Sequence, residues 1–255
     1  MTTPFDFRKR LRTGNRALSA WIGQDPRAAV TFSRMDFDAV TFDMQHGRLG
    51  QDDMLKGITF AALASKPVLV RIPVGEFQMA SRILDMGAIG IIAPMINSAA
   101  QARQFVSFCK YSPVGDRSWG PIDAIPFSGL DAQGYLHQAN DLCLALAMIE
   151  TQEALDGIDE ILSTPGLDGV FVGPHDLAVS ISAGRSLDTT SKQVEDALRA
   201  IASSCIKHSK VAGIYCGTGE SALHAQKLGY QLMGLGSDQT FLISAGQNAL
   251  AVARS

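Results

Sequence analysis

Hydrophobic and polar positions follow a repeating pattern along this chain. Short apolar runs, bounded by Gly, Pro or Asp, are each followed by a longer stretch with helical periodicity. The apolar runs predict eight strands, at Leu18–Ile22, Ala39–Phe42, Val68–Ile72, Gly90–Ala93, Cys143–Ile149, Gly169–Val172, Ala212–Tyr215 and Gln231–Gly234. The periodic stretches predict eight helices, at Pro26–Met35, Asp52–Ser65, Glu76–Met86, Ala99–Tyr111, Gln152–Thr164, Thr190–Ser209, Glu220–Leu228 and Gln239–Arg254.

The strands are almost continuously hydrophobic, which indicates burial on both faces, as in a parallel sheet covered by helices. Eight strand–helix units are the number that closes such a sheet into a TIM barrel. With 255 residues and 46% hydrophobic content, the chain can form one large core. We therefore predict an α/β fold, a single (β/α)8 barrel domain over residues 1–255.

Two features of the chain predict contact with a neighbouring subunit. Between Ser112 and Asn140 a Gly- and Pro-rich segment interrupts the repeat, and loops of this length are usually functional, interfacial or disordered. Trp119 and Phe127 within it argue against complete disorder. The final helix is apolar over Phe241–Val252, which suits packing on another subunit. We therefore expect a homo-oligomer.

The charge and the cysteines of the chain indicate which partners and which cellular location are expected. The 22 basic and 25 acidic residues give a formal charge of −3, and no Lys/Arg cluster follows the short R-K-R-L-R stretch at 8–12, so neither nucleic acid nor an anionic membrane is an expected partner. The apolar runs are too short to span a bilayer, and the N-terminus lacks the apolar region of a signal peptide. The four cysteines, Cys109, Cys143, Cys205 and Cys216, are scattered, which favours free thiols. A cytoplasmic location is expected.

Candidate catalytic groups stand at the carboxyl ends of the predicted strands, where the chemistry of TIM barrels is located. The charged residues at these positions are Asp43, His46, Arg71, Glu150 and Asp176. Because strand ends meet at one rim of a barrel, these side chains are expected to face a common cavity.

Glu150 and Asp176 suggest a metal site. Glu150 ends a strongly apolar strand, so its carboxylate needs a partner or a water-filled mouth. Asp176 follows the next strand, and two carboxylates with space for water and substrate suit Mg²⁺ or Mn²⁺ better than Zn²⁺. Alternatively, both residues serve only the dipoles of the helices that follow.

The remaining strand-end residues allow more than one interpretation. Arg71 requires an anion if it points inward, either a carboxylate substrate or a buried carboxylate of the protein. His46 is either a proton carrier or a packing residue, and His175 is the only other histidine at a strand end. None of the eight lysines stands at the carboxyl end of a strand, which disfavours Schiff-base chemistry.

Several ordered motifs make the chain resemble the HpcH/HpaI aldolase family of class II, metal-dependent pyruvate aldolases, from about Ala20 to Ala245. These motifs are F-D-M-Q-H-G, V-R-I-P, L-D-M-G-A-I-G-I-I-A-P-M, Y-S-P-V-G-D-R-S-W-G-P, A-M-I-E-T and G-V-F-V-G-P-H-D-L. The resemblance implies reversible cleavage of 4-hydroxy-2-oxo acids to pyruvate or hydroxypyruvate and an aldehyde, with Mg²⁺ or Mn²⁺, or with Co²⁺, in a homohexamer.

The same resemblance implies roles for individual residues. Glu150 and Asp176 would bind the metal, Arg71 would hold the oxo acid and its enolate, and His46 would move the proton. Asp43 would join the water network of the metal.

The resemblance also implies a substrate-binding group, formed by Gln45, Gly173, Pro174, His175 and Asp176, with backbone N–H groups of the last two holding the substrate carboxylate. Asp85 resembles the carboxylate that orients the catalytic histidine, yet it ends a helix near the opposite face of the barrel. It would therefore serve His46 of a neighbouring subunit.

The chain departs from the family pattern at Gln45, Met148 and His175, so no single aldehyde is implied. Two other interpretations stay open. One is a related lyase that cleaves acyl-CoA substrates, although no cationic site for nucleotide phosphates is visible. The other is a non-catalytic barrel that binds a small molecule.

Overall fold

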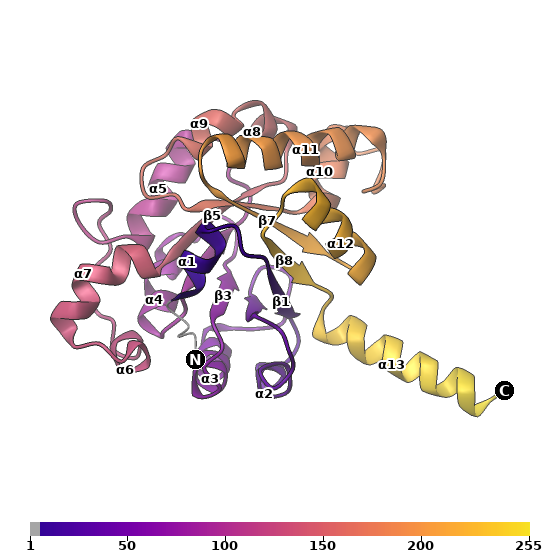
Figure 1. Ribbon diagram of the computed structural model, residues 1–255, viewed down its shortest axis with the longest axis horizontal. Coiled ribbons are helices and arrows are strands. Elements are labelled where there is room, and N and C mark those ends of the chain that lie inside the picture. Colours follow the sequence, from indigo (N-terminus) through magenta and orange to yellow (C-terminus); the bar gives the residue numbers. More distant parts are fainter. Residues whose placement is uncertain (1–5) are drawn as a thin grey trace.

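The computed structural model describes residues 6–255, and its centre is a closed barrel of eight parallel strands (Figure 1). Each strand pairs with the next along the chain, and β8 pairs with β1 to close the sheet. The strands are β1 Ala17–Ile22, β2 Ala39–Asp43, β3 Val68–Arg71, β4 Gly90–Ala93, β5 Leu144–Ile149, β6 Gly169–Val172, β7 Val211–Cys216 and β8 Leu232–Leu235. The predicted TIM barrel is confirmed, and every strand boundary lies within one residue of its prediction.

Helices surround the barrel (Figure 1). They are α1 Phe7–Arg12, α2 Ala28–Phe32, α3 Gln51–Leu63, α4 Gln78–Asp85, α5 Ala99–Cys109, α6 Ala124–Ser128, α7 Ala132–Leu142, α8 Gln152–Asp156, α9 Ile158–Leu162, α10 Pro174–Ile181, α11 Lys192–Lys207, α12 Gly219–Leu228 and α13 Asp238–Ala253. Within residues 6–255, no helix combines the length and apolar character needed to cross a membrane.

The helices differ from the sequence prediction in four places, the first of which is α1, a helix that was not predicted. The helix predicted over Gln152–Thr164 is broken into α8 and α9 at Gly157, a residue type with low helix propensity. A helix that was not predicted, α10, begins directly after β6. The long Ser112–Asn140 segment folds into α6 and most of α7, and it forms a small apolar cluster around Tyr111 and Tyr135.

Two apolar layers hold the barrel together. Side chains that point inward from the strands, including Leu69, Leu146 and Phe171, form one buried cluster, and those between strands and helices form a second. The inner cluster also contains Phe7 and Leu11 of α1. Helix α1 therefore closes the amino-terminal end of the barrel and leaves the carboxyl end open.

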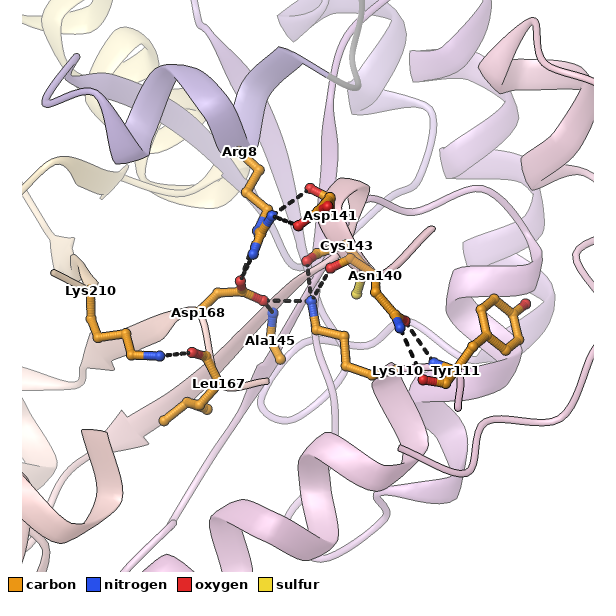
Figure 2. A network of polar contacts seen from close by, with 10 residues as sticks. All are labelled: Arg8, Lys110, Tyr111, Asn140, Asp141, Cys143, Ala145, Leu167, Asp168 and Lys210. Atoms are coloured by element: carbon orange, nitrogen blue, oxygen red, sulfur yellow. Dashed lines mark hydrogen bonds and ion pairs between the residues drawn. The ribbon is translucent and has the colours of Figure 1, made fainter. Parts of the chain in front are cut away.

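A buried charge network fixes this closed end (Figure 2). The Lys110 Nζ group is 1% exposed and donates to Asp168 Oδ2 at 2.7 Å and to the carbonyl oxygens of Asn140 and Cys143. The Asp168 carboxylate also accepts a bond from Arg8 Nε of α1 at 2.7 Å and one from the Ala145 N–H at 2.9 Å. The network thus joins α1 to the starts of β5 and β6.

Helix α13 extends away from the barrel, with the C-terminus at its far end (Figure 1). None of its residues is buried, and Leu242 and Val252 are 76% and 73% exposed. An apolar helix with this exposure is a typical site of protein–protein contact.

Lys110→Met should lower the free energy of unfolding by about 3–5 kcal/mol, because it leaves a buried carboxylate and two carbonyl groups short of their donor. Urea denaturation measures this change. Lys192→Met is the matched control, since Lys192 forms an exposed ion pair with Asp196 and its loss should cost about 1 kcal/mol or less. Equal, small effects for both variants would show that the buried network contributes little.

Candidate active site

A cavity of about 310 Å³ opens at the carboxyl ends of the strands. Its wall includes most of the residues that the sequence places at strand ends: Asp43, His46, Arg71, Gly173, Pro174, His175 and Asp176. The strand register explains this convergence. Asp43 and Arg71 are paired partners in β2 and β3, and Ile149 and Val172 are paired partners in β5 and β6. Glu150 and Gly173 therefore each follow a paired strand end.

Arg71 forms a two-pronged ion pair with Asp43. Its Nε donates to Asp43 Oδ1 at 2.9 Å and its Nη2 to Asp43 Oδ2 at 2.6 Å, and both side chains are largely buried. Burial raises the pKa of the Asp43 carboxyl, but the hydrogen bonds and charge of Arg71 outweigh burial, so that pKa lies below its ordinary value. The guanidinium also lies 5.1 Å from the centre of the Trp21 ring. Arg71 is thus held rigidly at the cavity wall.

The Asp-x-x-His-Gly sequence forms a turn that Asp43 stabilises. Asp43 Oδ1 accepts the backbone N–H groups of Gln45 and His46 at 3.0 and 3.3 Å. A Cβ atom at Gly47 would lie 2.1 Å from the Asp43 carbonyl oxygen, so only glycine fits there. The turn places His46 at the cavity wall, with its side chain exposed.

Asp43 and Gln45 have protein surroundings that the sequence did not predict. Asp43 lines the cavity and uses its oxygens for Arg71, Trp21 and the His46 turn. Gln45 is not part of the cavity wall, and its Oε1 is buried without a hydrogen-bond partner among residues 6–255. The resemblance alone had suggested Gln45 as a substrate ligand.

Glu150 directly follows β5, is 1% exposed and is not among the residues of the cavity wall. Its Oε2 accepts the Met95 N–H at 2.9 Å, and Met95 has the unusual φ of 56°. A Cβ at Gly173 would lie 2.5 Å from Glu150 Oε1, so this glycine makes space for the carboxylate. Burial raises the pKa of Glu150 to about 7, and the negative charge of Asp176 adds to the rise while Met95 and Arg71 oppose it.

Asp176 stands in the first turn of α10, with Gly173 as N-cap and Pro174 as the first helical residue. The first N–H groups of a helix have no partner within the helix and carry partial positive charge. The turn that contains His175 and Asp176 therefore offers anion-binding donors beside the cavity.

The donor set fits a hard cation that the protein holds through few ligands. The negative charge of Asp176 contributes to the raised pKa of Glu150, and a cation held by both carboxylates would offset the cost of burying Glu150. Residues 6–255 contain no cluster of three or more His, Cys, Asp or Glu side chains able to enclose a metal. Two carboxylates plus water and substrate oxygens match Mg²⁺ or Mn²⁺ better than a closed Zn²⁺ site.

Asp85 lies at the carboxyl end of α4, the helix that precedes β4, whereas His46 follows β2. It ends α4, and its Oδ1 accepts a bond from Arg117 Nη2 at 2.6 Å. Arg117 is buried and stacks 4.6 Å from the centre of the Tyr111 ring. Asp85 itself keeps a side chain that is 26% exposed, so the Ser112–Asn140 segment presents this carboxylate to the outside.

The cavity wall also contains residues that were not selected from the sequence. These are Trp21, Gly23, Gln24, Met148, Tyr215, Ser237 and Asp238. Trp21 and Tyr215 lie within strands and resemble core residues, whereas Asp238 is a charged residue beyond the end of β8 that the same positional criterion could have found.

Glu150→Gln should stabilise the metal-free protein at pH 8 and have little effect at pH 4. The carboxyl pKa is about 7 in the folded protein against a reference value of 4.5. A raised carboxyl pKa removes stability as the pH rises from 4.5 towards 7, by about 3 kcal/mol at about 1.4 kcal/mol per unit. Thermal unfolding in a metal chelator at both pH values measures the effect. The exposed Glu153→Gln is the control, and a Glu150→Gln variant without pH-dependent stabilisation contradicts the prediction.

Comparison with known proteins identifies the family to which this chain belongs. A family model described as HpcH/HpaI aldolase/citrate lyase matches residues 20–245. A hydroxypyruvate/pyruvate aldolase of Rhizorhabdus wittichii is 37% identical over 95% of this chain and 96% of its own. A 2-keto-3-deoxy-L-rhamnonate aldolase of Escherichia coli is 30% identical over 100% of this chain and 94% of its own.

Solved structures agree with these relatives. A HpcH/HpaI aldolase/citrate lyase family protein from Burkholderia cenocepacia has a TM-score of 0.89 and 27% identity, over 98% of this chain and 99% of its own. The citrate lyase beta subunit of M. tuberculosis, complexed with oxaloacetate and magnesium, has a TM-score of only 0.56 and 16% identity, so its likeness shows the fold alone. The chain therefore belongs to the HpcH/HpaI aldolase/citrate lyase family and is a carbon–carbon lyase of the metal-dependent aldolase type.

Proposed function

We propose that the protein cleaves 4-hydroxy-2-oxo acids reversibly to pyruvate or hydroxypyruvate and an aldehyde. The observation that carries this proposal is the placement of Arg71 and Asp176 in the wall of one cavity, beside the N-terminus of α10, with Glu150 buried against Gly173 of the same wall. This arrangement supplies two anionic metal ligands, a fixed cation and a set of backbone donors, which together suit a small 2-oxo acid.

Glu150 and Asp176 are the proposed ligands of a divalent cation, Mg²⁺ or Mn²⁺, with Co²⁺ as a further candidate. When bound, the cation acts as a Lewis acid that stabilises negative charge on the 2-oxo group. The raised pKa of Glu150 supports this assignment, because a buried carboxylate with one backbone donor still lacks a counter-charge.

The substrate carboxylate is proposed to bind at the first turn of α10, where the N–H groups of His175 and Asp176 are the donors. Gly173 and Pro174 shape this wall of the cavity. Arg71 borders the same cavity and, held in place by Asp43, stabilises the charge that develops on the 2-oxo oxygen.

His46 is the proposed proton carrier. An imidazole can accept a proton near neutral pH, and His46 is exposed at the cavity wall. In the cleavage direction it accepts the proton of the C4 hydroxyl group, the C3–C4 bond breaks, and the aldehyde leaves. The remaining enolate of the oxo acid then takes a proton at C3. No lysine is among the residues of the cavity wall, in keeping with chemistry that needs no imine.

The active form is proposed to be an oligomer, with a hexamer implied by the family resemblance. Helix α13 exposes its apolar residues along its whole length, and Trp119 and Ile122 of the Ser112–Asn140 segment are 47% and 81% exposed. Both surfaces would be covered in an assembly. The four buried free cysteines fit the cytoplasmic location that we propose.

Within this assembly, Asp85 is proposed to orient His46 of a neighbouring subunit. Its ion pair with Arg117 uses one carboxylate oxygen and leaves the side chain partly exposed beside the apolar Ser112–Asn140 segment. A carboxylate in this position can accept a bond from the imidazole of another chain.

Glu150→Ala and Asp176→Ala should each abolish divalent-metal binding and retro-aldol turnover while the fold persists, because both groups lie at the rim of the barrel. Titration calorimetry with Mn²⁺ measures binding, and a coupled assay of pyruvate release measures turnover. The loss should exceed the roughly 10–100-fold that changes around metal ligands usually cost. Glu153→Ala, an exposed carboxylate in α8, is the control.

Two results would contradict this assignment. Either variant could keep full metal-dependent turnover, in which case the metal ligands lie elsewhere. Borohydride treatment in the presence of pyruvate could also inactivate the wild-type protein by trapping a lysine, which would replace metal-dependent chemistry with an imine.

Mixed oligomers of His46→Ala and Asp85→Ala subunits should regain activity that neither variant has alone. If subunits mix at random, about a quarter of the sites contain both intact groups. Co-expression with two affinity tags, followed by the retro-aldol assay, measures this recovery. The matched control mixes His46→Ala with Glu150→Ala, since these two residues belong to one barrel and cannot complement each other. Equal activity in both mixtures, or full activity of Asp85→Ala alone, rules out the shared site.

A further inference from the structure

Asp238 holds the loop that follows β1. It is the first residue of α13 and lies at the cavity wall. Its carboxylate accepts three consecutive backbone N–H groups, those of Gly23 at 3.1 Å, Gln24 at 2.9 Å and Asp25 at 3.4 Å. Hydrogen bonds to an ionised acceptor are stronger than neutral ones. The side chain of Asp238, which follows the last strand, therefore fixes the loop that follows the first strand.

The bonds of Asp238 are not needed to start its own helix. Ser237 already caps α13, because its hydroxyl accepts the Thr240 N–H. The only helix N–H that Asp238 itself bonds is that of Gln239. Its other three bonds cross to a different element, so they serve the loop after β1.

This loop is in direct backbone contact with the turn that carries His46. The Gly23 carbonyl oxygen accepts the Arg48 N–H at 2.7 Å. A Cβ atom at Gly47 would lie 2.7 Å from the Gly23 carbonyl oxygen and 3.0 Å from its Cα, so no side chain fits between the two backbones. A shift of residues 23–25 would thus displace the neighbours of His46.

We propose that Asp238 is a positioning residue for the aldol reaction, acting on His46 through the loop after β1 and the turn at Gly47 and Arg48. The proposal rests on the proposed role of His46 as proton carrier. The carboxylate does not touch the reacting atoms. It keeps the loop and the turn in the one arrangement in which the imidazole meets the C4 hydroxyl group.

The test compares wild-type protein with Asp238→Ala, Asp238→Asn and Asp131→Ala. Asp131 is the matched control, because its carboxylate also accepts a backbone N–H, that of Gly134 at the start of α7, outside the cavity. Hydrogen exchange of residues 23–25 and 45–48, read by mass spectrometry, reports the arrangement of the loop and turn without any need for turnover. Retro-aldol kinetics and Mn²⁺ affinity are measured on the same samples.

Asp238→Ala should speed exchange in both segments and lower kcat on the order of 100-fold, the usual scale for misplacing a catalytic group by about 1 Å. Mn²⁺ affinity should stay unchanged. Asp238→Asn keeps one acceptor oxygen and should fall between wild type and Asp238→Ala in both readouts, and Asp131→Ala should match wild type.

Three results would overturn the proposal. If kcat falls while exchange is unaltered, Asp238 acts on the reactants directly. If exchange rises while kcat is unaltered, the loop does not position His46. If exchange in both segments is unaltered in all variants, Asp238 does not hold them, whatever the activity. A wild-type protein without retro-aldol activity would contradict the proposed function, while the exchange measurement would still decide whether Asp238 organises the loop.

Discussion

Closure of a parallel sheet is the constraint on which the rest of this structure depends. When eight strands run in one direction and the last pairs with the first, their carboxyl ends form one rim. Residues as distant in sequence as Asp43, Asp176 and Asp238 then surround one cavity without any loop having to bridge them. The opposite rim is filled by α1 and by the Lys110–Asp168 network, so stability and chemistry are placed at different ends of the barrel.

At the carboxyl rim, Asp43 and Glu150 are both buried carboxylates, but their hydrogen-bond partners and neighbouring charges differ. Asp43 has a full set of partners, including the guanidinium of Arg71, and its pKa is lowered. Glu150 has one backbone donor and a neighbouring negative charge, and its pKa is raised. The ionised form is therefore favoured at Asp43 and disfavoured at Glu150 as long as Glu150 has no positively charged partner. Both residues are carboxylic acids, so the opposite pKa shifts arise from their surroundings and not from the residue type.

The sequence predicted the barrel and its strands well because a buried parallel strand requires a continuous apolar run that few other elements require. It also located Asp176, Arg71 and His46 at the cavity wall, since strand ends are defined by the same pattern. Glu150 lies against Gly173 of that wall but is not itself part of it.

The sequence did not reveal partners that depend on side-chain packing. From the sequence, the anion that pairs with Arg71 could have been a substrate carboxylate or a carboxylate of the protein. The structure shows that Asp43 of the same chain forms an ion pair with Arg71. The Arg117–Asp85 pair was hidden because Arg117 lies in a segment without periodicity. The backbone partners of Asp238 were hidden because they lie in a loop more than 200 residues away in the chain.

The closure of the amino-terminal rim has a consequence for biosynthesis. Arg8 leaves the ribosome early, but Asp168, its buried partner, lies 160 residues later. At a synthesis rate of about 5–20 residues per second, helix α1 waits roughly 8–30 s for that partner. During this time the apolar side chains of Phe7 and Leu11 have no barrel interior to enter. Helix α1 thus reaches its final place only after the residues that lead into the sixth strand have been made.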